Sequence, residues 1–302
     1  QDTCGTVEHL IAHYAMAEAL LAMDMAMTEG PNGGYCPNYI GEGACSVDPV
    51  ALRSSVTAAL NFTIGDRHPY HPTSPPKPPA SSSSPYTRNK GGWRYDYWDS
   101  TFPDVNAMPW GVMAVRASEM AGIEIPEHPA GTHGETEYAI VQHALDTIHV
   151  NPIEYNGEWL GRQGYDYWPE GRGTGSNNHN IGGNLCRLLC GSSPDHPAIT
   201  EYLDNTGPGG NMALGTFWGR RAAELSGAAS WDDKTLEMMQ SLQVNPGQPI
   251  DPADPSSHNN GSIQAGTAHY RYYDNTGRFL AVCMAVAAMA EVEQGMRLTP
   301  AQ

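Results

Sequence analysis

The chain has 302 residues, enough for one large domain or two small ones, each with a buried core. Its 16 basic and 33 acidic residues leave a formal charge of −17, which argues against nucleic acid and anionic membrane surfaces as partners. The longest apolar run, residues 279–290, is too short to cross a bilayer, so no membrane span is expected.

Residues 7–23 are predicted to form a helix with apolar side chains on nearly all sides, and a helix of this kind is expected to be buried. His9 and His13 lie four residues apart on it and therefore share one face. This spacing can hold zinc or copper, but the HExxH glutamate is missing and no third ligand is evident. The favoured interpretation is that His9 hydrogen-bonds the end of a neighbouring helix, with a metal site as the alternative.

Several features favour an extracellular protein. The chain begins at Gln1 without an initiator Met, which is typical of a mature N-terminus after secretory cleavage. Cys36 and Cys45 bracket a loop rich in Gly, Pro and Asn, and we expect a disulfide between them. Asn61 and Asn260 head NFT and NGS sequons and are candidates for glycosylation.

A second helix is predicted to start after Asp48, a residue type that caps helix N-termini, with Pro49 in the first turn. Its apolar side chains recur at helical spacing and form a single stripe. The stripe consists of Leu52, Val56, Ala59 and Leu60.

Residues 68–88, HPYHPTSPPKPPASSSSPYTR, form a Pro/Ser-rich arm. A tract of this composition is extended and cannot build a core of its own. We expect the arm to lie on its own domain or on a second copy of the chain, and the second is favoured because prolines lower the entropy lost on docking. The prolines expected to matter most are Pro75, Pro76, Pro78 and Pro79.

The stretch GGWRYDYW, residues 91–98, has a near-copy in RQGYDYW, residues 162–168. Each copy is followed by an apolar stretch that a glycine closes, Gly122 after the first and Gly191 after the second. The recurrence favours a repeated architecture, in which the aromatic residues pack across adjacent helix ends, over a duplicated catalytic motif. Stacking on sugar rings is the alternative. Its candidates are Trp93, Tyr95, Trp98, Tyr167 and Trp168.

Further helices are predicted towards the C-terminus. Striped helices are expected at 140–148 and 236–242, and a second helix that is apolar on nearly all sides is expected at 278–293. No stretch is predicted to form a β-hairpin. Asp and Asn beside Gly at 204–207 and 274–277 favour turns, with calcium binding as the alternative, and no cofactor is predicted. Thiols in apolar helical runs are expected to be buried, namely Cys186, Cys190 and Cys283.

Apolar helices alternating with striped helices are typical of an α/α barrel, in which each helical hairpin buries its face against its neighbours. Residues 91–127 resemble the prenyltransferase and squalene-oxidase repeat, and SNNHNIGGNLCRLLCG resembles a further copy. The chain is similar to secreted bacterial proteins that consist of such repeats alone. The resemblance implies a single all-α domain over residues 1–302, an α/α toroid of about five hairpins with long Gly/Pro-rich loops.

The catalytic motifs of the enzymes with this fold are missing from the sequence. There is no Asp-x-Asp-Asp tetrad for a terpene cyclase, no Asp-x-Cys pair for a prenyltransferase zinc site, and no Cys-Gly-Glu-Gln thioester. Polysaccharide lyases on α/α toroids neutralise a carboxylate with Asn or His and abstract a proton with Tyr or His. The residues of those types near the second repeat are Asn178, His179, Tyr165 and Tyr167.

These observations predict a secreted or cell-surface bacterial protein that is non-catalytic and structural, and that associates with itself through the arm into rings or filaments. A carbohydrate-active enzyme of lyase type, and a module that binds carbohydrate or a small ligand, are the alternatives. An extracellular polysaccharide is the partner that both alternatives imply.

Overall fold

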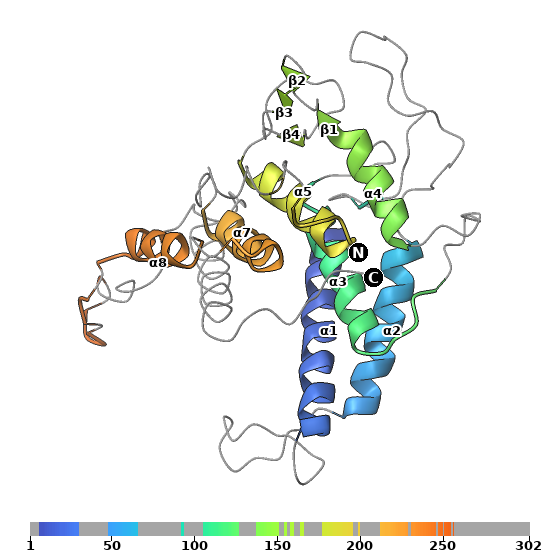
Figure 1. The fold of residues 1–302 in the computed structure, drawn as a ribbon. Helices are drawn as coiled ribbons and strands as arrows, with labels where there is room; N and C mark the ends of the chain where they lie inside the picture. Colours follow the sequence, from blue (N-terminus) through green and yellow to red (C-terminus); the bar gives the residue numbers. More distant parts are fainter. Residues whose placement is uncertain are drawn as a thin grey trace. The chain divides into compact units, whose positions relative to one another are not determined.

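The computed structural model describes residues 6–29, 48–65, 92–93, 105–126, 137–150, 154–155, 158–159, 164–165, 177–195, 199, 212–228, 231–245, 247–249, 251–254 and 256. The chain divides into two compact units, of which the first is mainly residues 1–148 and the second mainly residues 149–300. The first contains α1 (Thr6–Glu29), α2 (Pro49–Gly65), α3 (Met108–Met120) and α4 (Glu137–Ile148) (Figure 1). The second contains β1 (His149–Val150), β2 (Glu154–Tyr155), β3 (Glu158–Trp159), β4 (Gly164–Tyr165), α5 (Asn177–Leu189), α7 (Met212–Ser226) and α8 (Trp231–Leu242).

The described part of the chain is mainly helical, which is consistent with the all-α class. The predicted helix at 7–23 lies within α1, and the three striped segments lie in α2, α4 and α8. The apolar stretches that Gly122 and Gly191 close are α3 and α5. The helix predicted at 278–293 and the arm at 68–88 lie outside the described residues.

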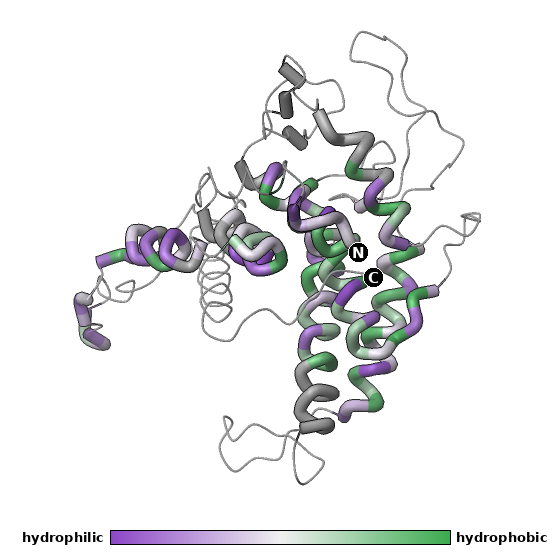
Figure 2. The backbone as a smooth tube through the Cα atoms, viewed as in Figure 1, coloured by the Kyte–Doolittle hydropathy of each residue, from purple (hydrophilic) through white to green (hydrophobic). Residues whose placement is uncertain are grey.

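The core of the first unit forms around α3, which packs against both α1 and α2. Every residue of α3 from Met108 to Ser118 is buried. The α2 helix is amphipathic, and its tube in Figure 2 alternates between hydrophobic and hydrophilic residues. Its inward residues continue the predicted stripe by one turn, because Thr63 and Ile64 are buried with Val56 and Leu60.

The expectation that α1 is buried on all sides needs a correction. Leu10, His13, Ala17 and Leu20 face the core, but the opposite side of the helix is exposed. The exposed positions hold small or charged residues, which cost little to leave in water. They are Glu8, Ala12, Ala15 and Ala19.

Tryptophans packed on helix glycines occur in both units. Trp93 lies on Gly111 in α3, and Trp231 lies on Gly219 in α7. A Cβ atom at position 111 would come within 2.6 Å of Trp93 Cζ3, so the helix can approach the ring this closely only at a glycine. Both rings are buried.

Three helices end in the same way. Gly122 follows α3 with φ +72°, and Gly191 follows α5 with φ +86°. The amide of the residue after each glycine donates back to a carbonyl in the last turn, Ile123 to Ser118 at 3.0 Å and Ser192 to Arg187 at 2.9 Å. Gly227 closes α7 with the same geometry. These are Schellman caps, for which glycine has the lowest conformational cost.

The N-terminus of α2 is capped as predicted, because Asp48 Oδ1 accepts from the Val50 amide at 2.9 Å. Replacing Asp48 by Ala should therefore lower the free energy of unfolding by about 1 kcal/mol. Urea unfolding followed by circular dichroism measures this change. Ser55→Ala is the control on the same helix, since the Ser55 hydroxyl is exposed, and it should change stability by less than about 0.5 kcal/mol. Equal losses in the two variants would show that the cap contributes nothing.

Two short antiparallel strand pairs in the second unit were not expected. The β1 strand pairs with β4, with His149 opposite Tyr165, and β2 pairs with β3, with Glu154 opposite Trp159. Asn156 and Gly157 separate β2 from β3 in the sequence, and an Asn-Gly dipeptide is the strongest short-range hairpin signal.

Candidate functional site

Three helices of the first unit meet at a pair of histidines on α1. His13 is fully buried and His9 is partly exposed. His9 Nε2 lies 3.1 Å from Thr63 Oγ1 and 3.3 Å from the Ala59 carbonyl oxygen, both on α2. His13 Nδ1 lies 2.8 Å from the same Thr63 hydroxyl, and its Nε2 lies 2.9 Å from Ser118 Oγ on α3. We call His9, His13, Thr63 and Ser118 the histidine cluster.

The donor and the acceptor of each hydrogen bond in the cluster can be assigned by starting from Ser118, the last hydroxyl in the series. Ser118 Oγ donates to the Ala114 carbonyl at 2.8 Å, so towards His13 it can only accept, and His13 Nε2 carries a proton. Neutral His13 then accepts at Nδ1 from the Thr63 hydroxyl, whose oxygen accepts in turn from His9 Nε2–H. The hydrogen bonds therefore run in one direction, from His9 through Thr63, His13 and Ser118 to the Ala114 carbonyl, and the Ala59 carbonyl is a second acceptor near His9 Nε2–H.

Burial keeps both imidazoles neutral. Burial, and to a lesser extent the charge of His9, lowers the pKa of His13 from 6.5 to about 3. Burial also lowers the pKa of His9, and the hydrogen bond to the Ala59 carbonyl opposes this change. All groups of the cluster are thus neutral at pH 7, which agrees with the assignment of donors and acceptors above.

The chemistry open to the cluster is limited by its burial. Thr63 and His13 have the contact of a nucleophile and its general base, but both have no exposed surface. Phe62 packs against the ring of His9, with centroids 4.4 Å apart. Among the described residues, no group of three or more His, Cys, Asp or Glu side chains could hold a metal ion. The histidine cluster links α1, α2 and α3 through hydrogen bonds inside an apolar core.

Trp93 contacts the same cluster through the backbone. It is 1% exposed, and its indole Nε1–H donates to the Thr63 carbonyl at 2.8 Å. Because the ring is enclosed between the end of α2 and Gly111 of α3, it cannot stack on a sugar at the surface. The ligand-binding candidacy of Trp93 is therefore corrected, because its ring is a core side chain packed between the end of α2 and Gly111 of α3.

The remaining candidates for sugar stacking, Tyr95, Trp98, Tyr167 and Trp168, lie outside the described residues. Tyr165 belongs to β4, and Asn178 and His179 lie in the first turn of α5, where the structure describes the backbone alone. The β4 strand contacts α5, and the side chains of Tyr165, Asn178 and His179 are not among those that the structure describes, so the lyase-type grouping stays a prediction. The predicted disulfide cysteines Cys36 and Cys45, the sequon at Asn260 and the four arm prolines also lie outside the described residues.

The Asn61 sequon lies on α2 with its two ends in different environments. Asn61 is exposed, whereas Thr63, whose hydroxyl completes the sequon, is buried in the histidine cluster. In the folded chain this hydroxyl is hydrogen-bonded to His13. A glycan on Asn61 would therefore have to be attached before α2 packs.

A second polar cluster links α3 to α4. Tyr138 on α4 donates its hydroxyl proton to Glu119 Oε2 at 2.5 Å, and Arg116 Nη1 forms an ion pair with the same oxygen. Burial raises the pKa of Tyr138, and the hydrogen bond to the Glu119 carboxylate raises it further. Tyr138 is therefore a permanent donor that anchors α4.

Polar side chains are also buried in the second unit. Arg220 Nη2 lies 2.8 Å from Glu224 Oε2 one turn along α7, and the Arg221 guanidinium lies 4.4 Å from the centroid of the Phe217 ring. Cys186 in α5 and Cys190, which follows the last residue of α5, are free thiols, and both are buried as expected. Burial raises the pKa of Cys186, so this thiol is protonated and unreactive at pH 7.

Sequence reasoning identified His9 and His13 but not the residues that bind them. Thr63 and Ser118 both occupy positions that continue the apolar face of their helices. A hydroxyl at such a position predicts a buried donor, which has to find an acceptor in a neighbouring helix. That signal was available at Thr63, which lies three and four residues after the predicted stripe positions 60 and 59.

In the part of the chain that the structure describes, no helix is both long enough and apolar enough to cross a membrane. Comparison of the chain with protein-family models, with curated proteins and with solved structures finds no match.

Proposed function

We propose that this chain is a non-catalytic structural protein that associates with itself. The observation that carries the proposal is the histidine cluster, in which two histidines and two hydroxyl side chains of the described part of the chain form a continuous chain of hydrogen bonds between three helices. Groups held in this way stabilise one packing of the helices. His13, Thr63 and Ser118 have no exposed surface, so they offer no reactive atom to a substrate. The cluster therefore supports a scaffold role.

For the fold, we propose the α/α toroid of the prenyltransferase and squalene-oxidase repeat type. The support is local: the tryptophan-on-glycine contact and the Schellman cap each recur in both units. Recurrence of the same two packing devices is what a repeat architecture requires. An extracellular location is proposed with it, supported by the spacing of Cys36 and Cys45 around a short loop and by the two sequons.

Self-association through the arm at 68–88 is supported by its composition, since a proline-rich segment loses little entropy when it docks. Deleting residues 70–86 should leave the helix content unchanged and shift the particle to smaller species. Light scattering coupled to size-exclusion chromatography measures the mass, and circular dichroism measures the helix content.

An unchanged particle mass after the deletion would contradict a role of the arm. The scaffold role itself would be replaced by the lyase-type alternative if the chain turned over a polysaccharide and if Asn178→Ala or His179→Ala abolished that turnover.

A further inference from the structure

The histidine cluster has one ring nitrogen that forms no hydrogen bond within the described part of the chain. The Ala59 carbonyl can only accept, so His9 Nε2, which lies 3.3 Å from its oxygen, carries the proton of the neutral ring. This agrees with the assignment that starts from Ser118 at the other end of the cluster. The lone pair of neutral His9 is therefore on Nδ1, since both hydrogen bonds of this ring use Nε2. His9 is partly exposed and can bind a proton at Nδ1 without losing a hydrogen bond.

His13 has no nitrogen of this kind. Its Nε2 donates to Ser118 and its Nδ1 accepts from Thr63, so a further proton would displace the Thr63 hydroxyl proton. Among the described residues, the polar groups that meet His13 are His9 from α1, Thr63 from α2 and Ser118 from α3, and none of them is acidic. Because His13 is fully buried, its cation would be enclosed without a counter-ion. A buried charge of this kind becomes stable only when it reaches solvent.

The charged side chains described on the three helices do not supply that counter-ion. The acids are Glu8, which is exposed, Glu18, which accepts from Tyr14, Asp48, which caps α2, and Glu119, which binds Arg116 and Tyr138. The bases are Arg53 on α2 and Arg116 on α3. The pKa of His13, about 3, accordingly reflects burial first and the charge of His9 second. The centroids of the two rings are 6.1 Å apart, so a proton on His9 makes a proton on His13 less favourable.

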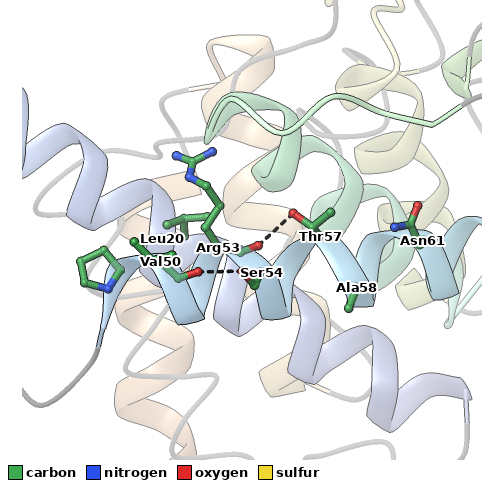
Figure 3. Close-up of a pocket in the computed structure, with 8 residues that line it drawn as sticks. Leu20, Val50, Arg53, Ser54, Thr57, Ala58 and Asn61 are labelled. Carbon is green, nitrogen blue, oxygen red and sulfur yellow. Dashed lines mark hydrogen bonds between the residues drawn. The ribbon is translucent and has the colours of Figure 1, made fainter.

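Of the three helices that the cluster joins, α2 is the least extensively packed. The α1 helix packs against α3 more extensively than either helix packs against α2. Thr63 attaches α2 to the other segments, since its hydroxyl contacts both imidazoles and its carbonyl accepts from Trp93. The opposite side of α2 is exposed, and Ser54 and Thr57 on it line an open groove of about 700 Å³ together with Leu20 of α1 (Figure 3). Loss of the Thr63 contacts would therefore loosen α2 before it loosens α1 or α3.

We infer that the histidine cluster is a conformational switch that releases α2 in acid. The first proton binds at His9 Nδ1 and leaves every hydrogen bond of the cluster in place. The second proton binds at His13 Nδ1 and replaces the bond from the Thr63 hydroxyl, and it is retained only when α2 moves away and His13 meets water. The α1 and α3 helices stay packed through their apolar contact. The switch needs one copy of the chain, so it does not depend on the proposed self-association.

Hydrogen exchange of the full chain between pH 7.5 and pH 4.5, corrected for the intrinsic pH dependence of exchange, tests the release. Opening of α2 lets His13 bind one proton, so the protection of the α2 amides should fall about tenfold for each pH unit below 6.5. At pH 5 it should be at least about tenfold lower than the protection of the α1 and α3 amides, because α2 opens by itself. His13→Gln should remove the pH dependence in α2, and His9→Gln is the matched control that should retain it. Protection of α2 that does not change with pH, or equal protection in all three helices at pH 5, would overturn the inference.

The order of the two protons can be measured in the unsubstituted chain, without relying on a variant that folds. Nuclear magnetic resonance correlations across the imidazole rings at pH 7.5 should show the Nε2–H form of both His9 and His13. On acidification His9 should become cationic while the α2 amides are still protected, and His13 should remain neutral until α2 opens. An Nδ1–H form of either ring at pH 7.5, or a cationic His13 beneath a protected α2, would contradict the switch.

Discussion

Replacing Gly111 by Ala should destabilise the first unit by about 2–4 kcal/mol. The new methyl group would overlap the Trp93 ring, which is fully enclosed and cannot move away without repacking α3. Displacing the ring also weakens the bond from its indole nitrogen to the Thr63 carbonyl, which holds the end of α2. At an open helical site the same substitution would instead stabilise by up to about 1 kcal/mol, so the sign of the effect reports the contact.

Gly65→Ala is the control for this prediction, because a Cβ atom at position 65 meets nothing within 4 Å. Chemical denaturation of both variants, followed by Trp fluorescence and circular dichroism, measures the two free energies of unfolding. A Gly111→Ala variant as stable as Gly65→Ala would show that Trp93 does not occupy its position against α3.

The stability of the first unit should fall steeply as the pH drops below 6.5, because His13 must remain neutral to keep its place. Its pKa is about 3 in the folded chain and 6.5 in the unfolded chain. Between these values the unfolded chain binds a proton that the folded chain does not, so acidification favours unfolding. The contribution is complete above about pH 7, and each pH unit below 6.5 removes up to about 1.4 kcal/mol.

His13→Gln isolates this effect, since glutamine is polar but does not titrate. We expect the loss of stability between pH 7.5 and pH 5 to be smaller in His13→Gln than in the unsubstituted chain, with the contributions of all other groups cancelling in the comparison. His9→Gln is the matched control, and it should change the pH dependence less because His9 is partly exposed. The same pH dependence in the unsubstituted chain and in His13→Gln would contradict a buried neutral imidazole at this position.

The sequence predicts the helices better than it predicts their contacts, and the histidine cluster illustrates the reason. Periodicity places His9 and His13 on one face of α1, because the spacing of side chains along a helix is a local property. Their partners Thr63 and Ser118 are 50 or more residues away, and the packing of three helices decides which hydroxyl meets which ring nitrogen. Propensity and pattern carry no information about that choice.

The role of Trp93 was also difficult to predict from the sequence alone. A tryptophan in a Gly-rich segment fits a sugar platform and a core contact equally well, and glycine at position 111 of another segment decides between them. The capping glycines at 122 and 191 are the opposite case, because a helix end is a local event and glycine alone favours positive φ there. The hairpin signal at Asn156 and Gly157 was equally local, and it identifies β2 and β3 once it is considered.

Direct imaging of the native particle by electron microscopy tests the central claim, that this chain is a self-associating scaffold. We predict particles built from several copies, either closed rings or filaments, that become smaller when the arm is deleted. Single chains of 32.6 kDa at every concentration and pH examined would contradict it.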